Sequence, residues 1–265
     1  MTLIQIIVLA VVQGLTEFLP ISSSGHLVLV PSVFGWTDQG LVFDVAVHFG
    51  SLAAVCAFFR HDIAALIRGT LAIVTGDTKG GEARMAINIA VGTIPAALAG
   101  LALAGWIAAN LRRPDVVVGT LVGYGLLLGL ADRLGRRTRV IPDVRVRDAL
   151  VIGVAQALAL VPGTSRSGVT ITAGLALGLR RRDAARFSFL LSAPVILLAT
   201  MYEVVILVTS GTAVPWENLG LAALISGIVA YLSIDFFMRF VSRIGLMPFV
   251  IYRVLLAAVI IYVVL

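Results

Sequence analysis

Long runs of apolar residues, separated by short polar segments, make up most of the chain. The runs fall at residues 3–12, 42–59, 86–109, 116–131, 150–161, 169–179, 187–209, 219–238 and 246–265. A helix needs about 20 mainly apolar residues, with about 17 as the lower limit, to cross a bilayer. Six runs reach or approach that length: 42–59, 86–109, 116–131, 187–209, 219–238 and 246–265. The pattern therefore predicts an all-α polytopic membrane protein with six transmembrane helices.

The three remaining runs, 3–12, 150–161 and 169–179, are too short to span. They lie beside two breaks in the apolar pattern, where Pro, Gly and Ser crowd together around Pro20 and Pro162. Non-helical backbone is tolerated at membrane depth only where other protein segments bury it or where it lines a cavity. We therefore expect each break to form the tip of a re-entrant helix-loop-helix hairpin.

The two breaks belong to an internal repeat. When the sequence is shifted by 143 residues, without a gap, a set of early residues coincides with later residues of the same type. The early set is Val8, Val11, Gln13, Leu15, Ser22, Ser24 and Gly25, and the later set is Val151, Val154, Gln156, Leu158, Ser165, Ser167 and Gly168. Apolar identities arise easily by chance in such a chain, but those of Gln, Ser and Gly do not. We predict one membrane domain, 1–265, with repeat one at about 1–131 and repeat two at about 148–265.

The distribution of basic residues predicts how these elements cross the membrane. If both hairpins return to the side they leave and six helices cross, sixteen lysines and arginines share one side, in the connections 60–85, 132–149, 180–186 and 239–245. The other side receives only Arg112 and Arg113. Basic loops stay in the cytoplasm, so both termini are expected outside, with one hairpin entering from each side. The repeats are then inverted, and their broken tips can meet near the middle of the membrane, where such folds place ligand sites.

Composition supports this interpretation and removes others. The 265 residues are 60% hydrophobic and 13% charged, whereas soluble globular domains carry about 25% charged residues. The net charge of +6 does not indicate a nucleic-acid partner, because the arginines cluster in short connections, as membrane topology requires. The single cysteine, Cys56, excludes a disulfide framework and a cysteine metal site.

The first break carries an unusual set of polar residues for such an apolar chain: Gln13, Glu17, Ser22, Ser23, Ser24 and His26. The first two are four positions apart and share a helix face, and Pro20 ends that helix. The serines are candidate caps of a second half-helix, whose free N–H groups favour an anion. A carboxylate, hydroxyls and an imidazole are thus predicted to lie close together.

The second break has a different set: Pro162, Gly163, Thr164, Ser165, Arg166, Ser167 and Gly168. The first two residues interrupt the helix, and the hydroxyl residues after them can cap the next one. Arg166 lies in the first turn of that helix, which is unfavourable for a cation by the helix dipole alone. Its position is explained if the guanidinium forks onto a phosphate held at the same N-terminus.

Together the breaks offer the groups that phosphoryl transfer needs, because positioning and charge neutralisation supply most of that catalysis. Gln13 and Glu17 present oxygen ligands of the kind that Mg²⁺ or Ca²⁺ binds. Three histidines and one cysteine are too few for a zinc site. Structural alternatives stay open: Glu17 and Arg166 as a buried ion pair, the serines as caps only, and His26 as a packing residue.

Other polar residues in the apolar runs are expected to have structural roles. Asp44 and His48 share a helix face and are expected to lie behind the residues that contact a substrate. Glu203 and Asp235 are candidates to pair with Arg253, because a charge at such depth needs a partner.

At these breaks the chain resembles the undecaprenyl-diphosphate phosphatase family of bacteria, the bacitracin-resistance type. The first family motif, Glu or Gln-x-x-x-Glu, is present as Gln13 to Glu17 and runs on to His26. The second, Pro-Gly-x-Ser-Arg-Ser-Gly, is present as Pro162 to Gly168. The likeness extends to 187–192 and 248–253. Gln rather than Glu stands at position 13, so a carboxylate is lacking there.

The resemblance implies an enzyme of the bacterial plasma membrane that removes one phosphate from undecaprenyl diphosphate and so recycles the lipid carrier for peptidoglycan synthesis. It also implies a divalent cation, a link to bacitracin resistance, and a site that opens to the periplasmic or extracellular side. Carried over by position, the catalytic residues are Glu17, Ser23, His26 and Arg166, with the metal at Gln13 and Glu17. The substrate would contact Ser22, Ser24, Gly163, Thr164, Ser165, Ser167 and Gly168. Ser23 is favoured as the nucleophile, with His26 and water as rivals.

Two other functions compete with this one. Inverted repeats with broken helices are also typical of transporters, so a transporter or polyprenyl-phosphate flippase is the main alternative. Release of phosphate from a polyprenyl diphosphate by the purified protein would distinguish the two. A phosphatase of the acid-phosphatase type uses two histidines and a distant basic motif, and fits less well. The sequence leaves the oligomeric state open, a homodimer included.

Overall fold

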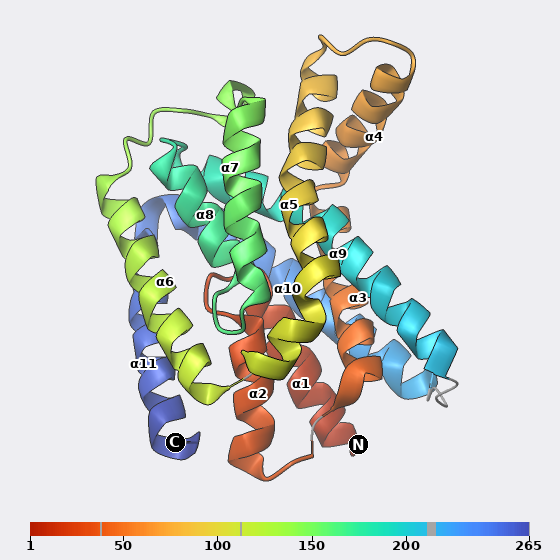
Figure 1. Cartoon of the computed structure of the whole chain (residues 1–265), viewed down its shortest axis with the longest axis vertical. Coiled ribbons are helices and arrows are strands. Elements are labelled where there is room, and N and C mark those ends of the chain that lie inside the picture. Colours follow the sequence, from red (N-terminus) through yellow and green to blue (C-terminus); the bar gives the residue numbers. More distant parts are fainter. Residues whose placement is uncertain (38, 112, 211–215, 265) are drawn as a thin grey trace.

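The computed structural model describes residues 1–37, 39–111, 113–210 and 216–264, and this part of the chain is helical, with one isolated β-bridge between Arg139 and Leu179. In chain order (Figure 1) its elements are α1 (Leu3–Thr16), α2 (Ser23–Phe34), α3 (Gly40–Phe58), α4 (Arg60–Val74), α5 (Gly81–Asn110), α6 (Pro114–Leu134), η1 (Ile141–Asp143), α7 (Val146–Ala157), η2 (Leu158–Leu160), α8 (Arg166–Ala176), α9 (Arg181–Ser210), α10 (Trp216–Ile244) and α11 (Met247–Val264).

Five of the described helices are long and apolar enough to cross a membrane: α5, α6, α9, α10 and α11. They correspond to five of the six predicted spans. The remaining prediction, 42–59, corresponds to α3, which an 87° bend at Phe59 separates from α4. The described chain therefore offers five candidate spans, or six when the bent pair is counted as one.

The connection predicted over 60–85 is wrong in its first part, where the structure has helix α4. Ile63 and Leu66 lie one turn apart and pack against the core, and many of the other side chains of this helix are exposed. A stripe this narrow is enough for an amphipathic helix, although the segment is too polar to stand out as an apolar run. Arg68 of α4 also reaches Glu82 of α5 with two hydrogen bonds, of 3.1 and 2.6 Å.

The two breaks form helical hairpins that point in opposite directions. In Figure 1, α1 and α2 extend from the first break toward the end where both chain termini lie, whereas α7 and α8 extend from the second break toward the other end. Ser22 and Ser165 cap the returning helices α2 and α8, with φ of 74° and 69°. Each accepts a hydrogen bond through its side chain from a glycine N–H three residues later, at 3.4 and 3.2 Å. The offset of 143 residues in the sequence thus recurs as the same local conformation.

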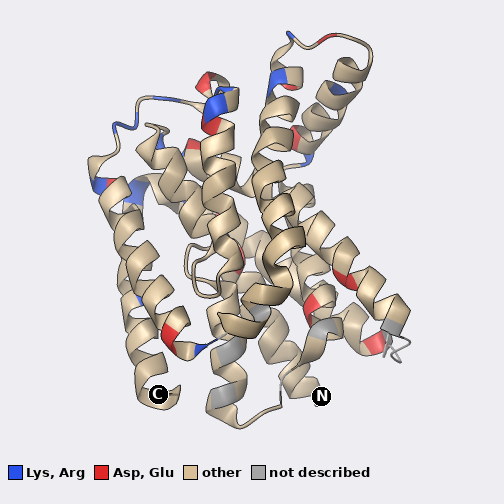
Figure 2. Cartoon of the chain, viewed as in Figure 1, with Lys and Arg blue, Asp and Glu red and all other residues tan. Residues whose placement is uncertain are grey.

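Lysines and arginines gather at one end of the molecule. Figure 2 shows them around the connections from α4 to α5 and from α6 to α7 and at the beginning of α9, away from both termini. Among the described residues, Arg113 lies elsewhere, just before α6, where it donates to Asp115. This separation of charge agrees with the asymmetry counted along the sequence.

Glycines bring α1 and α3 into close contact with α10. A Cβ atom at Gly50 would clash with the carbonyl oxygen of Ala223, and one at Gly14 would lie 2.5 Å from the carbonyl oxygen of Ser226. The Ser226 hydroxyl in turn donates to the carbonyl oxygen of Val47 at 2.8 Å. Small residues allow such backbone approach between membrane helices. The first hairpin is therefore fixed against a long helix of the second half of the chain.

Arg253 of α11 is fully buried and connects both breaks to α6. Its guanidinium donates hydrogen bonds of 3.0–3.4 Å to the carbonyl oxygens of Pro20, Thr120, Leu121, Gly163 and Thr164. The expected pairing of Arg253 with Asp235 is wrong, because Asp235 accepts instead from Arg239, one turn later on the same helix, at 2.8 Å. Three of these carbonyl groups, those of Pro20, Gly163 and Thr164, lie in the breaks, where no helix supplies a partner, and the other two lie within α6.

Substitution of Arg253 by lysine should lower the thermal stability of the protein. A single ammonium group cannot reach five carbonyl oxygens, and each buried acceptor left unpaired costs about 1–3 kcal/mol. We expect Arg253→Lys to unfold at a clearly lower temperature in detergent. Arg239→Lys is the matched control, because an exposed pair of this spacing contributes only about 0.3–0.5 kcal/mol. Equal melting temperatures for the two variants would contradict the role given to Arg253.

Candidate active site

Glu17 lies at the end of α1, where the helix gives way to the first break. Its carboxylate is buried, with 7% of the side chain exposed. Gln13, one turn earlier on the same face, donates from Nε2 to Glu17 Oε2 at 2.9 Å. Ser23, the first residue of α2, donates from Oγ to the same oxygen at 2.9 Å. The turn between the two half-helices thus brings a hydroxyl group back onto the carboxylate.

The second break supplies a cation to the same carboxylate. Arg166 is the first residue of α8, and its Nη2 donates to Glu17 Oε1 at 2.9 Å. The ring of Phe18 lies beneath the guanidinium, 5.7 Å from its centre, and Nη1 points to the carbonyl oxygen of Ser188 at 3.5 Å. Both oxygens of Glu17 are therefore engaged, which allows an ionised carboxylate to be buried here.

Ser23 and Arg166 occupy equivalent positions of the repeat, because they are 143 residues apart and each is the first residue of a returning half-helix. Ser23 binds one oxygen of Glu17 and Arg166 binds the other. The N-termini of α2 and α8 therefore meet at one carboxylate. Free N–H groups and the helix dipole make such termini favourable places for an anion.

The backbones of the two breaks interlock next to this carboxylate. Ser167 donates to the carbonyl oxygen of Leu19 at 3.0 Å, and the N–H of Gly163 donates to Ser24 Oγ at 3.4 Å. Gly163 has φ of +85°, and a Cβ atom there would clash with Thr120 Oγ1. Glycine is thus required at this point of the loop.

Both ring nitrogens of His26 are occupied. Nδ1 lies 2.7 Å from the carbonyl oxygen of Ser22 and Nε2 lies 2.6 Å from the hydroxyl of Tyr252, with the two rings stacked. A carbonyl oxygen only accepts, so Nδ1 carries the proton, and the neutral ring then accepts from Tyr252 at Nε2. Tyr252 is a site residue that the sequence did not reveal, since a tyrosine in an apolar helix resembles any packing or interfacial residue.

The hydroxyl groups of the two breaks differ in accessibility. Ser23 is partly exposed and Ser24 is exposed, so both can meet a ligand. Ser22, Ser165 and Ser167 are buried, and their hydroxyls act in caps and in serine pairs of 3.2 and 3.3 Å. The predicted substrate contacts at Ser22, Gly163, Thr164, Ser165, Ser167 and Gly168 therefore lie behind the accessible surface of the site, and their role stays a prediction.

His48 of α3 lies nearer to Glu17 than expected. Its Nε2 is 3.8 Å from Glu17 Oε2, and Nδ1 donates to the carbonyl oxygen of Asp44 at 2.7 Å. The helix face shared by Asp44 and His48 could be read from the sequence. The sequence does not show that this helix face points toward Glu17, because its direction depends on how α3 packs against α1.

The oxygen atoms around Glu17 bear on the predicted divalent cation. Gln13 Oε1 is buried and has no hydrogen-bond partner among the described residues, which leaves an oxygen atom that a cation could use. Among the described residues no group of three or more His, Cys, Asp and Glu side chains is arranged to hold a metal ion. Gln13 faces Glu17 with Nε2, and both oxygens of Glu17 already accept hydrogen bonds, so the divalent cation at these two residues stays a prediction.

Comparison with known proteins identifies the family. A family model described as bacitracin resistance protein BacA matches residues 6–259. The chain belongs to this family. A protein of Hahella chejuensis named undecaprenyl-diphosphatase is 54% identical over 258 residues, 97% of each chain. A protein of Stutzerimonas stutzeri named undecaprenyl-diphosphatase 2 is 53% identical over 262 residues, which are 98% of this chain and 97% of the relative. A protein of Teredinibacter turnerae named undecaprenyl-diphosphatase is 52% identical over 256 residues, 97% of each chain.

Substitution of Tyr252 by phenylalanine should change the hydrogen bonding of His26 in this BacA-family protein. The variant removes one hydroxyl group and retains the stacked ring, so Nε2 loses the donor that it accepts from. We expect the ¹⁵N resonance of His26 Nε2 to shift in Tyr252→Phe, while Nδ1 stays protonated against Ser22. Tyr231→Phe, a tyrosine of α10 packed on Phe58, is the control and should leave both resonances unchanged. An unaltered His26 spectrum in Tyr252→Phe would refute the assigned geometry.

Proposed function

We propose that this BacA-family protein is an undecaprenyl-diphosphatase of the bacterial plasma membrane. It hydrolyses undecaprenyl diphosphate to undecaprenyl phosphate and inorganic phosphate, which returns the lipid carrier to peptidoglycan synthesis. The observation that carries the proposal is the convergence of Ser23 and Arg166 on the two oxygens of Glu17, between two helix N-termini. The names of relatives aligned over nearly their whole length support the choice of substrate.

The diphosphate is proposed to bind where α2 and α8 begin. Arg166 presents a planar fork of donors, which matches phosphate oxygens, and Ser24 presents an accessible hydroxyl. The N–H groups at the two helix ends add positive potential without a mobile charge. Since these donors are already in place, little reorganisation is needed as charge develops on the transferred phosphoryl group.

Ser23 is the proposed nucleophile. Its Oγ already donates to Glu17 Oε2 at 2.9 Å, so the carboxylate can take the proton as Oγ attacks the terminal phosphorus. The new bond joins Oγ to phosphorus, and the bond from phosphorus to the bridging oxygen breaks, which releases undecaprenyl phosphate. Glu17 gives this proton to the bridging oxygen that leaves with undecaprenyl phosphate. It then takes a proton from a water molecule that attacks the phosphorus, the bond from Oγ to phosphorus breaks, phosphate is released, and Glu17 returns the proton to Oγ.

His26 is proposed to position α2 and to leave nucleophilic attack to Ser23. Its two nitrogens are taken up by Ser22 and Tyr252, so neither has a lone pair free for phosphorus.

Gln13 and Glu17 would hold a divalent cation, Mg²⁺ or Ca²⁺, which when bound would help to neutralise the negative charge of the diphosphate. This role of Gln13 uses its free Oε1 and needs no carboxylate at position 13.

The proposed membrane placement has six spans, α3, α5, α6, α9, α10 and α11, with α1–α2 and α7–α8 as re-entrant hairpins of an inverted repeat. The basic end lies in the cytoplasm by the positive-inside rule. Both termini then lie outside, and so do the ends of α1 and α2 that are farthest from the first break (Figures 1 and 2). The site is proposed to open to that periplasmic or extracellular side.

Turnover by the purified protein tests the activity and the nucleophile together. The wild type should release phosphate from a polyprenyl diphosphate, and Ser23→Ala should be slower by at least about 1,000-fold, as for the loss of a nucleophile. Arg166→Lys should lose about 100-fold, because a point charge cannot replace the fork. Acid quenching of a reaction with substrate labelled at the terminal phosphate should leave acid-stable label on the wild type and none on Ser23→Ala.

Other outcomes of this experiment have defined meanings. Acid-labile label that persists in Ser23→Ala would transfer the nucleophilic role to His26. Full turnover by Arg166→Lys would reduce the Glu17–Arg166 contact to a structural ion pair. No release of phosphate by a folded, lipid-supplied protein would overturn the enzymatic function and favour the transporter alternative.

Reporter fusions test the membrane placement independently of activity. Alkaline phosphatase fused after α11 should be active, because it folds only outside the cytoplasm, and green fluorescent protein at the same point should be dark. A fusion at Gly80, between α4 and α5, should give the reverse pattern. Fluorescence from the fusion after α11 would reject the inverted arrangement of the hairpins.

A further inference from the structure

A large hollow lies at the basic end of the protein, and none of the residues of the two breaks lines it. It has a volume of about 1180 Å³ and lies between the corner of α3 and α4, the beginning of α9 and the end of α10. Phe59 and Met238 are buried in its wall, and Phe58 and Phe240 add further apolar surface. The hollow thus combines an apolar floor with a charged rim.

The charges of this hollow are unbalanced. Its lining holds five arginines and three aspartates: Arg180, Arg182, Arg186, Arg239, Arg243, Asp62, Asp183 and Asp235. Every aspartate is engaged: Asp62 pairs with Arg186, Asp235 pairs with Arg239, and Asp183 accepts from the N–H of Ile141 at 3.1 Å. Within the described residues, the guanidinium groups of the other three arginines have no acidic partner. A phosphate-bearing ligand is the natural complement of such a rim.

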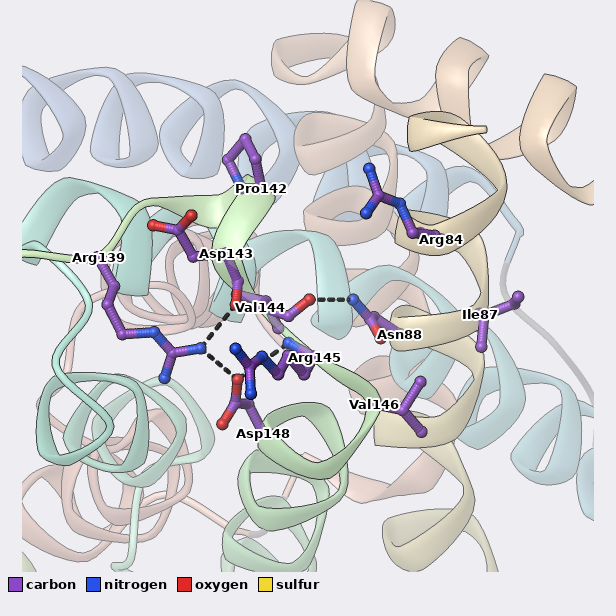
Figure 3. A pocket seen from close by; sticks show the side chains of 10 residues that line it. All are labelled: Arg84, Ile87, Asn88, Arg139, Pro142, Asp143, Val144, Arg145, Val146 and Asp148. Atoms are coloured by element: carbon purple, nitrogen blue, oxygen red, sulfur yellow. Dashed lines mark hydrogen bonds and ion pairs between the residues drawn. The ribbon is translucent and has the colours of Figure 1, made fainter. Parts of the chain in front are cut away.

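A second hollow at the same end, of about 750 Å³, provides a contrast (Figure 3). There Arg139 reaches across to Asp148 and to the carbonyl oxygen of Asp143, and Asn88 donates to the carbonyl oxygen of Val144 at 2.9 Å. Arg139 is thus already bound within the protein, whereas Arg84 and Arg145 of the same lining form no ion pair within the described residues. Of these two hollows, the one at α9 and α10 has three such arginines, and three phenylalanines lie in the same lining.

We propose that the hollow at α9 and α10 binds the phosphate headgroup of an anionic phospholipid from the cytoplasmic leaflet, with an acyl chain along Phe58 and Phe240. The proposal rests on the membrane placement above, and not on the phosphatase activity. Basic pockets between membrane helices at the cytoplasmic interface are suited to such headgroups. The positive-inside rule requires arginines on this side, but it does not require three of them to surround one apolar hollow.

Helix α9 connects this hollow to the candidate active site. Arg186, in the lining, lies two residues before Ser188, whose carbonyl oxygen faces Arg166. The Ser188 hydroxyl also pairs with Thr170 of α8 at 2.6 Å, and Phe189 packs on Phe18 with ring centres 5.4 Å apart. A lipid that holds the first turns of α9 would therefore also stabilise the helix that supports Arg166.

Lipid titration of the purified full chain tests the proposal. Phosphatidylglycerol is added in mixed micelles, with phosphatidylcholine at the same concentration as the neutral lipid, and binding is followed by native mass spectrometry and by melting temperature. The wild type should bind phosphatidylglycerol and melt at a higher temperature, with little effect of phosphatidylcholine. The double variant Arg182→Gln, Arg243→Gln should bind phosphatidylglycerol about 30-fold more weakly, since two arginines near an anionic lipid are lost.

The control is Arg133→Gln, Arg136→Gln, which removes the same charge from exposed residues at the same end, outside the hollow. It should retain wild-type binding, and all three proteins should melt alike in phosphatidylcholine. Wild-type affinity for phosphatidylglycerol in the Arg182, Arg243 variant would overturn the site. An equal loss of affinity in the control variant would also overturn it, because it would indicate a diffuse attraction between the basic end and the anionic lipid. Stabilisation by inorganic phosphate as strong as that by phosphatidylglycerol would overturn the assignment to a lipid.

Discussion

The contact between the guanidinium of Arg253 and five backbone carbonyl oxygens is the interaction on which the remaining architecture depends. A helix that breaks inside a membrane leaves carbonyl groups without partners, and hydrocarbon offers none. Here the two breaks lie side by side, and one planar cation supplies donors to both and to α6. The cost of burying that cation is offset because its donors are used within the protein. Loops that would otherwise be unstable can then hold Glu17, Ser23 and Arg166 in fixed positions.

The two hairpins, which share a repeated sequence pattern, give one carboxylate two different partners at equivalent places. Ser23 and Arg166 each begin a half-helix, yet one is a hydroxyl and the other a cation, and they approach opposite oxygens of Glu17. The backbone geometry of the repeat is kept by the capping serines Ser22 and Ser165. The residue after each cap differs, and so does the position of the carboxylate, because Leu160 stands where the first repeat has Glu17. Symmetry therefore supplies the framework, and departure from symmetry supplies the chemistry.

The sequence predicts what is encoded locally. Helix breaks, caps and spans follow from Pro, Gly and Ser spacing and from apolar length, and the family motifs singled out Glu17, Ser23 and Arg166, which the structure brings together. It does not predict partners that depend on packing: Tyr252 meets His26 across 226 residues, and Arg253 binds carbonyls and not Asp235. Carbonyl acceptors leave no trace in the sequence, because every residue has one. Helix α4 was not predicted for a different reason. Its apolar stripe is narrow, and its many polar residues resemble those of a loop.

The position of Tyr252 and Arg253 on neighbouring residues of α11 has a consequence for biogenesis. Every group that they contact belongs to helices or loops made earlier, from Pro20 to Thr164. During synthesis the carbonyl groups of the two hairpins therefore lack the hydrogen bonds from Arg253, and His26 lacks the one from Tyr252, until α11 packs beside α6. A nascent chain that lacks α11 holds the residues of the site without their arrangement, so the protein becomes competent only at the last helix-packing step.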